Sequence, residues 1–136
     1  MYLYNQEGTK LKYDLKEKIG TGAYGNVYKI SDTECIKIYT KKEPINIETV
    51  QYINNLNLKN FYIIYQLLYN KNGLFKAYTM KYYQSQNIDL LTIPMDYIIT
   101  NLYNLYDSVT KLTKNNIYIS DMHIYALHAF YISTNI

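Results

Sequence analysis

Three glycines and one lysine are the residues whose types and spacing in this sequence could do chemistry. Gly20, Gly22 and Gly25 stand at two- and three-residue steps in the stretch IGTGAYGNVYKI, and Val27 follows the last of them by two residues. Because glycines carry no side chain, their backbone N–H groups can approach phosphate oxygens closely. Lys37, in the stretch CIKIY, would add a positive charge one strand away. The pattern predicts a phosphate-binding hairpin with a lysine beside it.

The residues after the glycines decide which kind of phosphate loop this could be. In a dinucleotide-binding domain such glycines open a helix, but here Val27, Tyr28 and Ile30 alternate like a strand that ends in a turn at Ser31 and Asp32. A P-loop would need Gly-Lys-Ser/Thr after the glycines, and none follows. A glycine-rich hairpin that continues as a strand, with a lysine on the next strand, is typical of protein kinases. Three glycines in a plain turn are the alternative reading.

Five strands and two helices are expected to position these residues. Alternating apolar residues predict a three-stranded antiparallel meander over residues 13–39, and two further strands in FYIIYQLLY and LFKAYTMKYY, joined by the turn NKNG. Helical spacing of apolar residues predicts one helix over residues 46–57 and a longer one over residues 96–114. The expected fold class is α+β, with a five-stranded antiparallel sheet and one packed helix, followed by a helical segment.

The chain resembles the protein kinase family over the small lobe and the start of the large lobe. Gly20, Gly22 and Gly25 match the glycine-rich loop of that family and Val27 its following valine, while Lys37 matches the lysine of the V-A-I-K strand. The stretch AYTMKYY is similar to the fifth strand of the small lobe where it runs into the hinge.

The resemblance implies an adenine nucleotide, ATP, as the ligand. It places Met80 at the position that gates the adenine pocket and Tyr82 in the hinge, so that both join the glycines, Val27 and Lys37 as expected cofactor-binding residues. It also implies a kinase-like N-terminal lobe over residues 1–83, with the hinge and a truncated helical C-terminal segment over residues 84–136.

The catalytic residues of the family match less well. Glu48 is the only acidic residue on the first predicted helix that could pair with Lys37, and it lies about one residue out of register. Asp121 stands in the place of the catalytic base, but residues 119–120 read Ile-Ser instead of His-Arg, and Ala126 falls where the family has its metal-binding asparagine. Asp121 is also the last acidic residue of the chain, so there is no D-F-G motif and no metal site is predicted.

These features predict a truncated, pseudokinase-like domain that binds adenine nucleotide weakly, with little need for Mg²⁺ and without efficient phosphoryl transfer. Such a domain would act as a pseudokinase or an interaction module, and whether it is an enzyme stays open. The alternative is an active Ser/Thr protein kinase, or a small-molecule phosphotransferase, whose chain is incomplete here. A third possibility is a small interaction domain that keeps the fold and has lost the nucleotide.

Composition restricts the partners. All 14 basic residues are lysines and the net charge is only +3, so nucleic-acid binding is not expected. Cys35 is the single cysteine, and no apolar run approaches the roughly 20 residues that span a bilayer, which predicts a cytoplasmic protein without membrane contact. The long helix carries an apolar stripe within residues 98–112, through which we expect a homodimer or another protein partner. The members of this stripe are Ile98, Leu102, Leu105, Val109 and Leu112.

Overall fold

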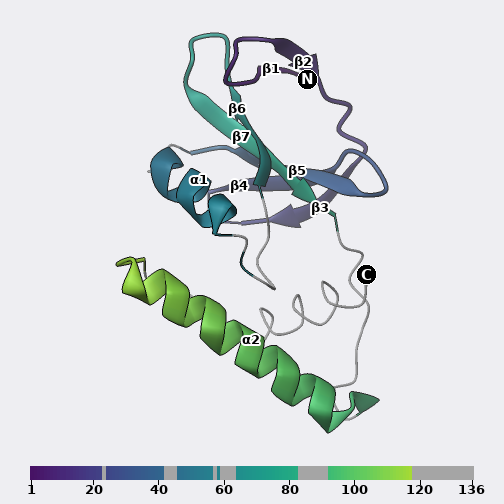
Figure 1. The fold of residues 1–136 in the computed structure, drawn as a ribbon. Helices are drawn as coiled ribbons and strands as arrows, with labels where there is room; N and C mark the ends of the chain where they lie inside the picture. Colours follow the sequence, from purple (N-terminus) through teal and green to yellow (C-terminus); the bar gives the residue numbers. More distant parts are fainter. Residues whose placement is uncertain (23, 42–45, 57, 59–63, 83–91, 118–136) are drawn as a thin grey trace. The chain divides into compact units, whose positions relative to one another are not determined.

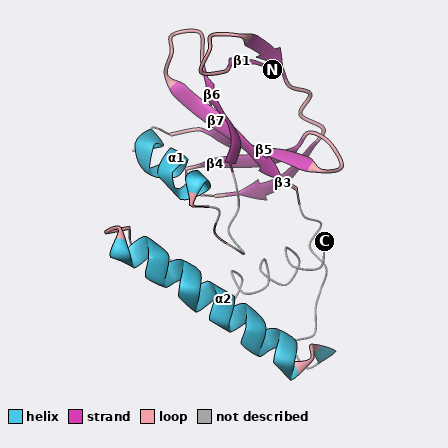
Figure 2. Ribbon diagram, in the orientation of Figure 1, coloured by secondary structure: helices cyan, strands magenta, loops and turns pink. Residues whose placement is uncertain are grey.

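The fold consists of one antiparallel sheet and two helices in the part of the chain that the structure, a computed structural model, describes: residues 1–22, 24–41, 46–56, 58, 64–82 and 92–117 (Figures 1 and 2). The strands are β1 (Tyr2–Tyr4), β2 (Lys10–Lys12), β3 (Glu17–Thr21), β4 (Gly25–Lys29), β5 (Glu34–Tyr39), β6 (Ile64–Tyr69) and β7 (Phe75–Lys81). The helices are α1 (Ile47–Asn55) and α2 (Met95–Lys114). The predicted α+β class is confirmed.

The sheet has seven strands in the order β2-β1-β6-β7-β5-β4-β3, so the prediction of five strands is wrong. The five expected strands are β3 to β7, and a short N-terminal hairpin of β1 and β2 extends the sheet beyond β6. The predicted meander begins at residue 13, whereas residues 13–16 lie between two strands, since β2 ends at Lys12 and β3 begins at Glu17. The reason lies in the backbone between them, because Tyr13 N–H donates to the Met1 carbonyl (2.8 Å) and Lys16 N–H to the Lys29 carbonyl (3.1 Å).

The core lies on one face of the sheet. Ile36 and Ile38 of β5 are buried there with Ala77 of β7, Leu68 of β6 and Leu3 of β1, because residues two apart on a strand share a face. The tyrosine hydroxyl of Tyr13, at the edge of this core, donates to the Gln66 side-chain oxygen at 2.8 Å. Burial, with a smaller contribution from the negative charge of Glu34, raises the pKa of that hydroxyl. Further half-buried side chains pack against the core: Leu11, Leu15, Tyr28 and Ile30.

Both helices form close to their predicted positions. The Asn46 side-chain oxygen accepts the Thr49 N–H (3.0 Å), which caps the start of α1. Helix α2 carries Asp96 in its first turn and two lysines in its last, the arrangement that its dipole favours. It ends at Lys114, and Asn116, just beyond the C-cap Asn115, has a φ of 59°, the left-handed conformation that commonly follows the end of a helix. Neither described helix is long and apolar enough to cross a membrane.

The chain divides into two compact units. Residues 1–50 and 62–83 form the first, which contains the whole sheet, and residues 51–61 and 84–136 form the second, which contains α2. Helix α1 begins in the first unit and ends in the second. The division into lobes at residues 83 and 84 stays a prediction.

Candidate functional site

The glycine-rich segment forms the hairpin between β3 and β4, as the sequence predicts. Gly20 pairs with Val27 across the hairpin, and the turn is closed by a hydrogen bond from the Gly22 N–H to the Gly25 carbonyl at 2.8 Å. Tyr24, at the tip, is anchored to the end of β5, because its carbonyl accepts the N–H groups of Thr40 (2.9 Å) and Lys41 (3.3 Å). Its side chain remains about half exposed, at 49%. The backbone at the tip of the hairpin is therefore held by hydrogen bonds, whereas the Tyr24 side chain is accessible to solvent.

The three glycines are not equivalent in the fold. A Cβ on Gly25 would lie 2.2 Å from the Ile38 carbonyl oxygen, so the close approach of β4 to β5 requires glycine there. A Cβ on Gly20 or Gly22 would meet its nearest neighbours at 3.7–3.8 Å, which is ordinary van der Waals contact, and neither glycine has a positive φ. Glycine inside a strand costs stability and often marks a place where a ligand or another backbone comes close. Close packing thus requires glycine at Gly25, whereas Gly20 stands at a register shift of β3 and Gly22 in the turn, and no contact closer than 3.7 Å requires glycine at either position.

Lys37 lies at the middle of the sheet, on the face opposite the core. It is directly opposite Val27 on β4 and Tyr78 on β7, so these three side chains form one row across three strands. Lys37 is half-buried, and its ammonium nitrogen is 4.9 Å from the centre of the Tyr39 ring. The rings of Tyr39 and Tyr78 are 6.1 Å apart, so the lysine stands beside an aromatic pair. A cation next to aromatic faces is attracted by their negative quadrupole.

Met80 occupies the next row of the same face, opposite Cys35. Cys35 is buried, and its thiol lies 3.7 Å from the Lys81 carbonyl, to which it donates a weak hydrogen bond. Burial, reinforced by the nearby charge of Glu34, raises the pKa of the Cys35 thiol to about 11, so that it stays protonated at neutral pH. This thiol is therefore a packing group beside Met80 and not a nucleophile.

Tyr82 follows β7, where the resemblance places the hinge. Its backbone N–H donates to the Thr33 carbonyl at 2.8 Å, so an adenine ring could contact only its carbonyl oxygen or its side chain. The Lys29 ammonium lies 5.1 Å from the centre of the Tyr82 ring and 2.9 Å from the Asp32 carboxylate. The hydrogen bond from Lys29 lowers the pKa of that carboxyl. Lys29 is thus already held by Asp32 and the Tyr82 ring, whereas Lys37 makes no ion pair with a carboxylate among the described residues.

Glu48, the predicted partner of Lys37, lies on α1. Glu48 is exposed in the first turn of α1, and the two ion pairs of the described residues, Lys29–Asp32 and Asp107–Lys111, do not include it. The pairing of Lys37 with Glu48 stays a prediction. Asp121 lies outside the described residues.

Helix α2 presents two different faces. Its buried positions, at four- and three-residue steps, contain Leu105 and Leu112 of the predicted stripe, whereas Leu102 is exposed. The other two buried positions are polar, Asn101 and Ser108, which a search for apolar periodicity does not find. A second apolar row lies in solvent about a third of a turn or more away from the buried face. It contains Met95, Ile99, Leu102, Tyr103 and Tyr106.

Sequence reasoning missed the neighbours of Lys37 on its own face. Tyr39, Tyr78 and Cys35 share that face because the three central strands pair in regular register. The alternation of β5 contained the signal, since Cys35, Lys37 and Tyr39 are two residues apart. The partner Tyr78 could be found only by knowing the pairing of β5 with β7.

No protein-family model matches the chain, and no curated protein matches it in sequence. The resemblance to protein kinases therefore stays a prediction from the sequence motifs.

Proposed function

We propose that the face of the sheet formed by the glycine-rich hairpin, Val27, Lys37 and Met80 binds an adenine nucleotide in the manner of a kinase small lobe, without efficient phosphoryl transfer. The observation that carries this proposal is the environment of Lys37, a half-buried residue. Among the described residues it has an aromatic ring as neighbour and no carboxylate, and it lies one strand from the hairpin. A partly buried cation without a counter-ion is stabilised by an anion, and a phosphate chain can supply one.

The glycines support the same ligand. Gly20 and Gly22 are glycines that the packing of the described chain does not require, at the point where a phosphate chain would approach the backbone. Val27 and Met80, in adjacent rows of the same face, offer apolar contact to a base. The nucleotide would place its base near the Met80 row and its phosphates between the hairpin and Lys37.

The proposed lack of catalysis follows from the sequence. Phosphoryl transfer depends on metal ions that neutralise the phosphates and on a base that orients the nucleophile. Alanine stands at position 126, where the kinase pattern has its metal-binding asparagine, and Ile-Ser stands at residues 119–120, where it has His-Arg. Binding without turnover is therefore the proposed function, and an active phosphotransferase is the alternative.

Calorimetric titration of the 136-residue chain with ATP, with and without Mg²⁺, tests the proposal. We expect binding that changes little with Mg²⁺ and weakens about tenfold or more in Lys37→Met, since a charge-assisted hydrogen bond contributes about 1.5–3 kcal/mol. Lys18→Met is the matched control, because it removes the same charge from an exposed side chain of β3 that pairs with Tyr28 and not with Val27.

Two results would contradict this function in different ways. Absence of heat and of thermal stabilisation at about 1 mM ATP, a concentration that detects even weak binding, would refute nucleotide binding. Metal-dependent transfer of a labelled γ-phosphate by the chain would refute only the lack of catalysis and favour the alternative.

We propose in addition that α2 associates with α2 of a second copy through its exposed apolar row. Met95, Ile99 and Tyr106 are 59–70% exposed on one side of the helix, more than a lone surface residue would explain. Charge favours an antiparallel pair, since Asp96 in the first turn would approach Lys111 and Lys114 in the last turn of the other copy.

Sedimentation measures this association directly. We expect a dimer that Ile99→Asp converts to monomer, while Thr100→Asp, which adds the same charge on the neighbouring polar side, leaves it intact. A wild-type chain that remains monomeric at about 1 mM, where a Kd of 1 mM would already give abundant dimer, would contradict the proposal.

A further inference from the structure

Two turns of this fold share the sequence pattern Tyr-Asn-x-x-Gly and the same hydrogen bonds. Residues 4–8 read Tyr-Asn-Gln-Glu-Gly between β1 and β2, and residues 69–73 read Tyr-Asn-Lys-Asn-Gly between β6 and β7. In each turn the asparagine side-chain oxygen accepts the backbone N–H groups two and four residues later, at 2.8–3.1 Å. The glycines, Gly8 and Gly73, both adopt a positive φ, of 80° and 75°. The two loops therefore have one conformation.

The sheet brings these two turns together. β1 and β6 are antiparallel neighbours whose matched residues are Tyr4 and Tyr69, so each turn begins at one member of the same pair. A hollow of about 630 Å³ lies between the turns, lined by residues 4–6, Gly8, 69–71 and Gly73. Pockets for small ligands commonly have volumes of about 300–1,000 Å³. We call this hollow the twin-turn groove.

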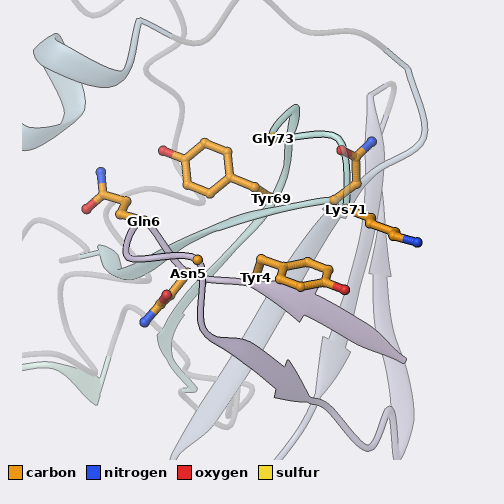
Figure 3. A pocket seen from close by; sticks show the side chains of 8 residues that line it. Tyr4, Asn5, Gln6, Tyr69, Lys71 and Gly73 are labelled. Carbon is orange, nitrogen blue, oxygen red and sulfur yellow. The ribbon is translucent and has the colours of Figure 1, made fainter.

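The tyrosines give the twin-turn groove two aromatic surfaces. In the view of Figure 3 the Tyr4 ring extends toward the side where Lys71 lies and the Tyr69 ring toward the side of Gln6. Tyr69 is also supported from behind, since its ring makes an edge contact with Phe75 at 6.0 Å between centroids. In this view each ring thus extends toward a polar side chain of the opposite turn.

Polar groups around the rings are left without partners. Within the described part of the chain, the hydroxyls of Tyr4 and Tyr69, the amide of Gln6, the Asn70 side-chain nitrogen and the Lys71 ammonium make no hydrogen bond or ion pair. The asparagine oxygens, by contrast, are fully used in holding the turns. The groove therefore offers hydroxyl and amide groups, which donate and accept, on a backbone that is already fixed.

This combination fits a neutral sugar better than an anion. One lysine supplies a single point charge, without the several donors that converge on a bound phosphate. Two tyrosine faces flanked by amides and hydroxyls suit a pyranose ring, whose C–H face is apolar and whose rim carries hydroxyl groups. We propose that the twin-turn groove binds a neutral oligosaccharide, with a sugar ring against each tyrosine. This site uses the ends of β1 and β6 and their turns, and it shares no residue with the proposed nucleotide site on β3, β4, β5 and β7.

Binding can be measured on the whole chain with maltotetraose, cellotetraose and chitotetraose as probes, by calorimetry and by saturation-transfer NMR. We expect saturable binding of at least one of them. Tyr4→Ala and Gln6→Ala should each weaken it about tenfold, a loss near 1.4 kcal/mol. Tyr2→Ala is the matched control for Tyr4, because Tyr2 is an exposed tyrosine of the same strand that does not line the groove.

The variants distinguish a loss of sugar binding from a loss of folding. Gln6 is exposed and outside every strand, so its loss should not unfold the chain, and thermal melts of Tyr4→Ala show whether its effect is on folding. If no probe binds at about 10 mM, or if binding survives both Tyr4→Ala and Gln6→Ala, the proposal is wrong. Binding of inorganic phosphate or of a sulfated oligosaccharide that Lys71→Gln abolishes, without binding of the neutral probes, would likewise overturn it in favour of an anion site.

Discussion

Replacing Gly25 by alanine separates the structural from the ligand-binding role of the glycine-rich hairpin. The added Cβ would lie 2.2 Å from the Ile38 carbonyl oxygen and 3.0 Å from the Tyr39 Cα, so that β4 and β5 must move apart by about an ångström where they meet. Both atoms belong to backbone in the middle of the sheet and cannot swing aside as a flexible side chain could. The clash would also disturb the pairing of Gly25 with Tyr39.

The cost can be estimated from overpacking in cores, which destabilises by about 1–3 kcal/mol. Because the clash is with backbone, we expect the upper part of that range, about 2–3 kcal/mol, and a fall in melting temperature of roughly 5–15 °C. Gly22→Ala should change the free energy of unfolding by less than about 1 kcal/mol, since its Cβ meets nothing closer than 3.8 Å.

Circular dichroism melts and urea titrations of the two variants measure these changes. The same samples titrated with ATP give the second half of the prediction, in which Gly22→Ala melts like the wild type and yet binds nucleotide more weakly. If Gly25→Ala melts within about 1 °C of the wild type, β4 and β5 do not approach closely enough at this position to exclude a Cβ. If Gly22→Ala binds ATP as well as the wild type, Gly22 contributes only to the geometry of the turn and not to binding.

Two further predictions concern the sheet. Cys35 should resist alkylation by iodoacetamide at pH 8 and react only when urea unfolds the chain. Burial raises the pKa of its thiol from 9.0 to about 11, so its contribution to stability is complete below pH 9 and is lost as the pH rises toward 11. Cys35→Ala should therefore lose less stability than the wild type over that interval. Leu68→Ala removes a fully buried side chain of the core and should lower the free energy of unfolding, measured by urea titration, by about 2–5 kcal/mol. Leu74→Ala, at a position 64% exposed, should change that free energy by no more than about 0.5 kcal/mol. Equal effects of the two substitutions would show that the core is wrongly placed.

Most of the sheet could be predicted from the sequence, but its N-terminal hairpin could not. Strands β3 to β7 are five to seven residues long, so their alternation and their turns could be read directly. β1 and β2 have three residues each, too few for alternation to stand out, and they are held by Leu3 in the core and by pairing with each other and with β6. The turn between them repeats the Asn-x-x-Gly pattern that did identify the turn after β6, and that repetition was the available signal.

Only part of the candidate site could likewise be predicted from the sequence. The positions of the glycines and of Lys37 along the chain predicted a hairpin and a neighbouring strand, because those relations are local. The row of Val27, Lys37 and Tyr78 depends on the register of β5 with β7, which joins segments about 40 residues apart and leaves no local trace. Burial on α2 was predicted only in part, since Asn101 and Ser108 lie inside the buried face where hydrophobicity alone would not put them.

The single matched pair that joins β1 to β6 has a consequence for how the chain folds. Tyr4 and Tyr69 are 65 residues apart, whereas β3, β4 and β5 are linked by short turns, as are β6 and β7. Closing a long loop costs more chain entropy than closing a hairpin, so the N-terminal hairpin should dock after the rest of the sheet has formed. Contacts made after the transition state affect the rate of unfolding more than the rate of folding. Changes in residues 1–12, including a tag fused to Met1, should therefore shorten the lifetime of the native state while leaving the speed of its formation nearly unchanged.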